Sequence, residues 1–208
     1  MGVKYVYCSG PLFCPEETAG MSAISKVLED SGFITFLPHR DGIERFVTRF
    51  INTPLNVDLM GSRRKMDNAI FALDVYQIVK RCDCLVMNMN GRVPDEGAVA
   101  EAGIAFAAGK PVVLYKNDVR TIFKGGDNSM IRGLSACPPV SRLKMLPDVI
   151  RNIEPSAANI SGRLLKAVNY GEKIWSFLKH VPSSGLNTKE QNEIIIEIMR
   201  ISEAQADN

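Results

Sequence analysis

The sequence lacks the features that mark several common classes of protein. Lys and Arg number 25 and Asp and Glu 23 among 208 residues, so the formal net charge is only +2. The basic excess typical of nucleic-acid-binding proteins is therefore missing. No apolar run approaches the roughly 20 residues of a membrane span, and the first residues hold no long apolar stretch of the kind found in secretory signals. We expect a protein that binds neither nucleic acid nor membrane.

Cysteine and histidine are also scarce. The five cysteines are too few and too scattered for a disulfide framework, so a reduced, cytoplasmic protein is expected. Cys82 and Cys84 flank an aspartate, but no second cysteine pair or nearby histidine completes a zinc site. The two histidines, His39 and His180, lie far apart, and nothing supports a Ser-His-Asp site. No metal is expected.

A glycine-rich phosphate loop is missing as well. Gly125 and Gly126 form a lone pair without the spacing of a Walker or dinucleotide-binding motif. ATP or NAD is therefore not expected, and we predict a protein that works without a cofactor.

What the sequence does contain is an alternation of strand and helix patterns. Strands are predicted at residues 3–9, 33–37, 84–89 and 111–115, and helices at 16–31, 66–80 and 97–108. Residues 39–66 are polar and basic with few clear periods, and they are predicted to form a long loop or lid. This alternation is typical of an α/β fold with a doubly wound parallel sheet, of the Rossmann or flavodoxin type.

The C-terminal part has a different character. Residues 157–180 and 188–203 are predicted to form two extra helices. We expect a domain over residues 1–150 and, over 151–208, a helical extension packed on that same domain. Isoleucines in the last helix either cover the sheet or form an interface, and packing is the favoured interpretation: Ile194, Ile195, Ile196, Ile198 and Ile201.

Carboxylates gather where such a sheet would bind a ligand, at the carboxyl ends of its strands. Asp95, Glu96 and Glu101 follow the third strand, around the start of a helix. A helix N-terminus favours a charged carboxylate, so Glu101 is expected to be ionised, as a nucleophile must be. Asp74 lies beside apolar residues of the preceding helix, where burial would raise its pKa and suit it to donate a proton. This pairing of nucleophile and acid suits chemistry at a glycosidic bond.

Plainer interpretations exist for the same residues. Asp95 or Glu96 would serve equally well as a helix cap. Glu101 would be an ordinary surface glutamate, and Asp74 a solvated acid on a helix.

Four segments resemble the nucleoside 2-deoxyribosyltransferase family. The most specific is Val93–Pro111, in which Asp95, a glutamate six residues later and a Gly-Lys-Pro strand start coincide. The others are Tyr7–Phe13, Phe36–Gly42 and Leu73–Tyr76. The resemblance covers roughly residues 3–135. The spacing from Asp74 to Asp83 is about one residue longer than is usual in the family, which leaves the helix register near Asp74 open.

The resemblance implies a role for each of four residues. Glu101 matches the nucleophile that attacks C1′ of a 2′-deoxyribonucleoside. Tyr7 matches the tyrosine whose hydroxyl orients that carboxylate, although a structural tyrosine at a strand end is the alternative. Asp74 matches the acid that protonates the departing base and deprotonates the incoming one. Asp95 matches the acid that binds the sugar hydroxyls, chiefly on the 5′ side.

Further residues are implied to contact substrate. Asn128 and Met130 match an Asn-x-Met element that reaches into a neighbouring subunit's site, so a homo-oligomer, at least a dimer, with shared active sites is expected. Gly10 belongs to the motif after the first strand, and Phe13 either stacks on the base or packs in the fold. Asp41 is the best candidate for a base contact in residues 39–66, with a loop-ordering salt bridge as the alternative.

The function implied is transfer of deoxyribose between bases through a covalent intermediate, with retained configuration and no metal or cofactor. Its partners would be 2′-deoxyribonucleosides and free nucleobases. A hydrolase of deoxynucleosides or their 5′-monophosphates is the main alternative. The carboxylate of Asp95 disfavours a phosphate at its side, by roughly one to several kcal/mol in a partly buried site. A non-catalytic nucleotide sensor on the same fold is a further alternative.

Overall fold

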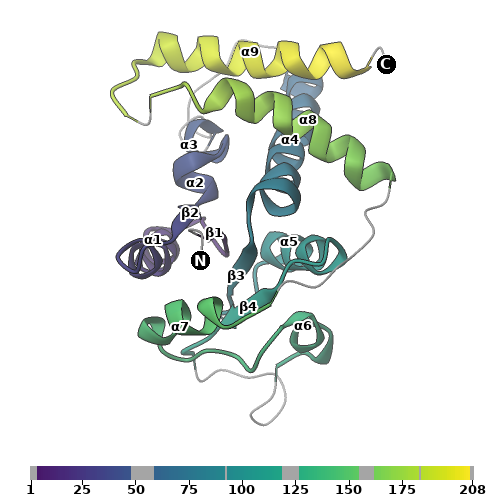
Figure 1. Cartoon of the computed structure of the whole chain (residues 1–208). Helices are drawn as coiled ribbons and strands as arrows, with labels where there is room; N and C mark the ends of the chain where they lie inside the picture. The colour runs from purple at the N-terminus through teal and green to yellow at the C-terminus, as the bar shows by residue number, and fades with distance from the viewer. Residues whose placement is uncertain are drawn as a thin grey trace. The chain divides into compact units, whose positions relative to one another are not determined.

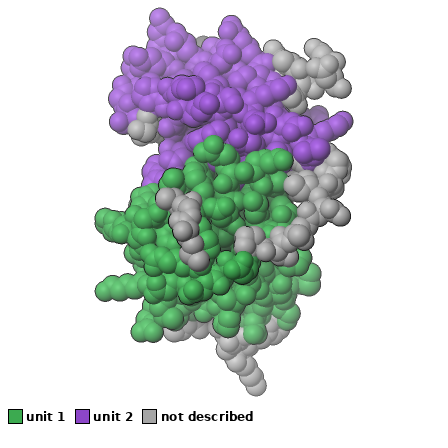
Figure 2. Space-filling model, in the orientation of Figure 1, with its two compact units in different colours: residues 1–37, 78–160 green, residues 38–77, 161–208 purple. Residues whose placement is uncertain are grey.

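The computed structural model describes residues 4–47, 59–91, 93–118, 127–154, 162–182 and 184–206. By its internal contacts the chain divides into two compact units, coloured separately in Figure 2. Unit 1 comprises residues 1–37 and 78–160, and unit 2 comprises residues 38–77 and 161–208. Neither unit is continuous in sequence, and the C-terminal segment shares its unit with residues 38–77.

Unit 1 is built on a four-stranded parallel sheet (Figure 1). Its strands are β1 (Tyr5–Ser9), β2 (Ile34–Phe36), β3 (Cys84–Asn88) and β4 (Val112–Tyr115), in the order β2-β1-β3-β4. Parallel bridges from Val112 to Ser135 and from Tyr115 to Val140 extend the outer edge. The strand order reverses direction at β1 and β3, which is the switch point where doubly wound sheets bind their ligands. The predicted α/β architecture is confirmed.

The helices of unit 1 are α1 (Pro15–Glu29), α5 (Glu96–Ala107), α6 (Ser129–Leu134), the short 3₁₀-helix η2 (Leu143–Met145) and α7 (Leu146–Arg151). Those of unit 2 are α2 (Pro38–Asp41), α3 (Glu44–Val47), α4 (Leu59–Tyr76), α8 (Gly162–Leu178) and α9 (Thr188–Ala206). A π-helical segment, η1 (Gln77–Arg81), leads from α4 towards β3. Across the described residues, every helix is too short or too polar to span a membrane.

The two faces of the sheet receive alternate residues of each strand. On one face, Val6 and Cys8 of β1 join a core with Met21 of α1 and Ile150 of α7. On the other face lie the side chains of Tyr7 and Ser9, directed towards α5. The short β1 strand thus buries apolar residues on one side while it presents hydroxyl groups to a helix on the other.

Unit 2 is a cluster of helices in which α4 packs closely on α8 and α9. Gly171 allows α8 to approach α4 closely, because a Cβ at that position would collide with the carbonyl oxygen of Ala72. In α9 the side chains of Ile194, Ile195 and Ile198 are buried, while Ile196 is half exposed. The favoured interpretation of the isoleucines as packing residues therefore holds for three of them.

The predicted long loop over residues 39–66 is wrong in its described parts. The chain forms α2 and α3 directly after β2, and α4 begins at Leu59 rather than at Met66. Arg63 and Arg64 in the early turns of α4 are exposed and polar, so this part of the sequence lacks the apolar periodicity by which a helix is predicted. Residues 48–58, and the pair Gly125 and Gly126, lie outside the described residues.

The segment η1 explains the long spacing between Asp74 and Asp83. A π-helical turn accommodates one residue more than an α-helical turn. Beyond it, Asp83 is held at the start of β3, where its carboxylate accepts a hydrogen bond from the Tyr5 amide at 2.7 Å. The extra residue is therefore absorbed before the sheet begins.

Candidate active site

The centre of the candidate site is a carboxylate held by two hydroxyl groups. Tyr7 Oη donates a hydrogen bond to Glu101 Oε1 at 2.7 Å, and Ser9 Oγ donates one to Glu101 Oε2 at 2.5 Å. Tyr7 and Ser9 are both fully buried, whereas Glu101 is partly exposed. The ring of Tyr7 stacks on Phe36 of β2, with centroids 5.4 Å apart, which fixes the direction of its hydroxyl. Each oxygen of the carboxylate has its own donor.

Helix α5 presents Glu101 one turn beyond its N-terminus. Asp95 is the N-cap of this helix, and its Oδ1 accepts a hydrogen bond from the Ala98 amide at 2.8 Å. The capping interpretation of Asp95 is therefore confirmed as a structural role, and the cap fixes the side chain in one orientation. The interpretation of Glu101 as an ordinary surface glutamate is wrong, because its carboxylate faces β1.

Gly10, directly after β1, lies where no side chain would fit. A Cβ at this position would stand 2.6 Å from Met21 Sδ and 2.8 Å from Asn88 Cβ. A close approach of the chain to α1 and β3 thus accounts for the glycine. Its predicted contact with substrate stays a prediction.

The segments after β3 and β4 are joined by side-chain hydrogen bonds. Asn90 Oδ1 accepts from the amides of Asn117 and Asp118, at 3.0 and 3.2 Å. The Gly91 amide donates to the Asp118 carboxylate at 3.2 Å. The two segments therefore form one connected rim at the carboxyl end of the sheet.

The Asn-x-Met element follows a nearly buried ion pair. Lys116, after β4, pairs with Asp127, and their side chains are only 9% and 15% exposed. Asn128 then caps α6 by accepting a hydrogen bond from the Met130 amide at 2.9 Å. The side chain of Met130 is 79% exposed and that of Phe13 is 86% exposed. Packing inside unit 1 therefore does not explain Phe13, and its stacking on a base stays a prediction.

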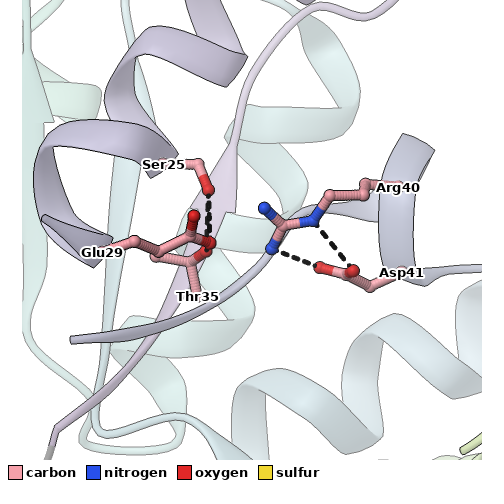
Figure 3. Close-up of polar contacts among 5 residues, drawn as sticks. All are labelled: Ser25, Glu29, Thr35, Arg40 and Asp41. Atoms are coloured by element: carbon pink, nitrogen blue, oxygen red, sulfur yellow. Dashed lines mark hydrogen bonds and ion pairs between the residues drawn. The ribbon is translucent and has the colours of Figure 1, made fainter. Parts of the chain in front are cut away.

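Asp41 and Asp74 belong to unit 2. Arg40 forms a bidentate ion pair with Asp41, with both N···O distances 2.9 Å, as Figure 3 shows. This is the salt bridge that the sequence left as the alternative for Asp41. Its base contact stays a prediction.

Asp74 is 8% exposed, so the interpretation as a solvated helix acid is wrong. It shares a hydrogen bond with Glu44. Burial raises the pKa of the Glu44 carboxyl, while the hydrogen bond with Asp74 acts in the opposite direction. Asp74 is thus a buried carboxyl group beside a second, partly buried carboxyl group.

The buried cysteines are poor candidates for chemistry. Burial raises the pKa of the Cys84 thiol to about 12, and it also raises the pKa of Cys82. Both stay protonated at neutral pH, and a thiol is a much weaker nucleophile than a thiolate. Among the described residues, no group of three or more His, Cys, Asp or Glu side chains is arranged to hold a metal ion.

Comparison with known proteins identifies the family. The sequence model of the nucleoside 2-deoxyribosyltransferases matches residues 6–188. The chain belongs to the nucleoside 2-deoxyribosyltransferase family. It is therefore an enzyme, a pentosyltransferase, and membership implies deoxynucleoside substrates.

Two solved structures resemble the chain. A 2-deoxyribosyltransferase from Bacillus psychrosaccharolyticus is 20% identical, with a TM-score of 0.48, and the match covers 75% of this chain and 99% of that one. A conserved protein from Enterococcus faecalis V583 is 18% identical, with a TM-score of 0.38, over 86% of this chain and 98% of that one. A search of curated proteins gave no match.

The structure brings some of the predicted site residues together. Tyr7 and Glu101 are in direct contact, and Asp95 caps the helix that carries Glu101. Ser9 had no predicted role, although it contacts Glu101 as Tyr7 does. The sequence did hold a signal for this contact: Ser9 follows Tyr7 by two residues, and residues two apart on a strand lie on the same face of the sheet.

Proposed function

We propose that the enzyme exchanges the base of 2′-deoxyribonucleosides through a covalent bond between deoxyribose and Glu101, with retained configuration at C1′. The observation that carries this proposal is the Glu101 carboxylate, held through both oxygens by Tyr7 and Ser9. A carboxylate fixed in this way against β1 is arranged to attack a carbon atom in one defined direction. Family membership supplies the substrate class.

The reaction takes place in two displacements. In the first, a carboxylate oxygen of Glu101 forms a bond to C1′, the bond from C1′ to the base nitrogen breaks, and the base takes a proton from Asp74. In the second, a nitrogen of the incoming base attacks C1′, the ester bond to Glu101 breaks, and the proton of the incoming base passes to Asp74. Two inversions at C1′ give retention. Its burial supports Asp74 as the group that carries the proton.

Asp95 is the proposed partner of the 5′ side of the sugar. Its Oδ1 is used by the helix cap, and the geometry of that cap holds Oδ2 in place as an acceptor for a sugar hydroxyl. A 5′-phosphate would meet the same carboxylate and be repelled. We therefore favour free deoxynucleosides over their monophosphates as substrates.

A second subunit is proposed to complete the site. Met130 belongs to the Asn-x-Met element and Phe13 is the candidate for stacking on the base, and both side chains are mostly exposed in the single chain. Their exposure supports a homo-oligomer in which Asn128 and Met130 reach a neighbour's substrate. We also propose a cytoplasmic location and a role in nucleotide salvage.

The test is incubation with deoxyinosine, with and without adenine, followed by chromatography. New deoxyadenosine supports transfer. Free deoxyribose alone would show hydrolysis, and an unchanged substrate would favour the sensor. Deoxyinosine 5′-monophosphate is run in parallel, and its faster turnover would contradict the proposed role of Asp95.

A further inference from the structure

Ser9, like Tyr7, is fully buried, so it acts through Glu101 rather than on the sugar. Its hydroxyl lies 2.5 Å from Glu101 Oε2, while Tyr7 donates to Oε1. Whichever oxygen bonds to C1′, a hydroxyl donor therefore faces it and a second donor faces the other oxygen.

The strength of these hydrogen bonds changes during the reaction. A hydroxyl bonds a charged carboxylate about twice as strongly as a neutral acceptor such as an ester. The ester between Glu101 and deoxyribose therefore has weaker hydrogen bonds than the free carboxylate. When the ester bond breaks, its electron pair returns to Glu101 and the bonds from Tyr7 and Ser9 regain their full strength.

We propose that Ser9 is a positioning residue that favours cleavage of the bond between deoxyribose and Glu101, by stabilising the carboxylate as it leaves C1′. The inference rests on the proposed function. It assigns to Ser9 a role in the second displacement, in which Glu101 is the leaving group and any donor to its oxygens lowers the barrier.

The test compares the native enzyme with Ser9→Ala and Ser9→Cys, the second of which keeps the side-chain size but donates only weakly. Each is mixed with deoxyinosine at fixed hypoxanthine and quenched with acid. Intact-mass spectrometry then gives the ratio of deoxyribosyl enzyme to free enzyme. Both variants should raise this ratio by about 10- to 100-fold, the effect of one hydrogen bond to a charged group.

Two kinetic readouts separate this role from a structural one. With the second displacement slowed, kcat and KM should fall together. The acidic limb of the kcat/KM profile should move to higher pH by roughly one unit, because a donor to the charged carboxylate is lost.

Ser25→Ala is the matched control. Ser25 is a buried serine of unit 1 whose hydroxyl lies 2.7 Å from Thr35 Oγ1 and 2.9 Å from Glu29 Oε1 (Figure 3). This variant also loses a buried hydroxyl, but it should keep the native ratio, kcat and pH profile.

The outcomes are distinct. A native ratio in both Ser9 variants would overturn the inference, and so would a shift in Ser9→Ala that Ser9→Cys does not share, because packing would then explain it. If the native enzyme forms no deoxyribosyl adduct, or if Glu101→Gln still exchanges bases, the proposed function itself fails.

Discussion

The two units surround their key carboxyl groups in opposite ways. In unit 1, Glu101 is partly exposed and accepts hydrogen bonds from the neutral hydroxyls of Tyr7 and Ser9, which favour the charged form. In unit 2, Asp74 is buried beside Glu44, a second carboxyl whose pKa burial raises. Two adjacent carboxyl groups in a largely buried environment repel each other when both are charged, so this environment favours one proton shared between them.

This difference fits the proposed roles, in which Glu101 is a charged nucleophile and Asp74 a neutral proton donor at the same pH. A nucleophile must be charged and a proton donor must be neutral, and the contrast between hydroxyl donors and burial separates the two states. Substitutions in the environment of either carboxyl group alone test this comparison.

The largest effect is expected when the carboxylate of unit 1 is removed. Glu101→Gln keeps the size of the side chain, but its amide has only one oxygen that accepts a hydrogen bond and it cannot attack C1′, so base exchange should fall by about four orders of magnitude or more. Glu96→Gln, an exposed glutamate of the same helix, is the control and should exchange normally. Initial rates with deoxyinosine and adenine measure both. Activity in Glu101→Gln within tenfold of native would remove Glu101 as the nucleophile.

The next effect concerns the buried acid of unit 2. Asp74→Asn should lower kcat/KM by about 10²- to 10⁴-fold, the usual contribution of a general acid or base. The loss should shrink for nucleosides whose base leaves without a proton. Asp67→Asn, an exposed aspartate of α4, is the matched control. An equal loss for all leaving groups would argue against proton transfer by Asp74.

A smaller effect separates the two roles of Asp95. Asp95→Ala should lower the free energy of unfolding by about 1 kcal/mol through loss of the helix cap, whereas Asp95→Asn should keep the cap. Both should lose deoxynucleoside activity, and Asn should improve turnover of the 5′-monophosphate relative to the nucleoside. Urea unfolding and steady-state kinetics give the two quantities. If activity followed stability across the pair, the sugar contact would be unsupported.

The smallest effect is a pH dependence of stability from Glu44. Its folded pKa lies above the ordinary value of 4.5, so the stability it contributes is complete below that value and is lost as the pH rises towards the folded pKa. Relative to the native enzyme, Glu44→Gln should therefore gain stability between pH 4.5 and neutral pH, by at most about 1.4 kcal/mol per pH unit. Thermal unfolding across this pH range measures the difference in stability. Parallel curves of stability against pH for the two proteins would show that Glu44 contributes no such pH dependence.

How far the sequence predicts the structure differs between the units for a physical reason. The strands around Tyr7 and the helix after Asp95 follow from apolar runs and a cap residue, which are local signals. The packing of α8 on α4 depends on Gly171 meeting the backbone at Ala72, a contact between residues far apart in sequence.

Within the site, the sequence predicts best what rests on local chemistry. The family motif places Asp95 and Glu101 on one helix, and the strand period aligns Tyr7 with Ser9. The hydrogen bond between Ser9 and Glu101 depends on how α5 lies over the sheet, and the shared hydrogen bond of Glu44 with Asp74 depends on the folding of a segment with no apolar period.

The most direct test is to locate the covalent intermediate. The enzyme is incubated with deoxyinosine, quenched in acid, cut with pepsin and examined by tandem mass spectrometry. The account predicts a deoxyribosyl group on Glu101, in the peptide from α5, which disappears when excess adenine is added before the quench. Base exchange with the sugar attached to another residue, or with no adduct at any time point, would contradict it.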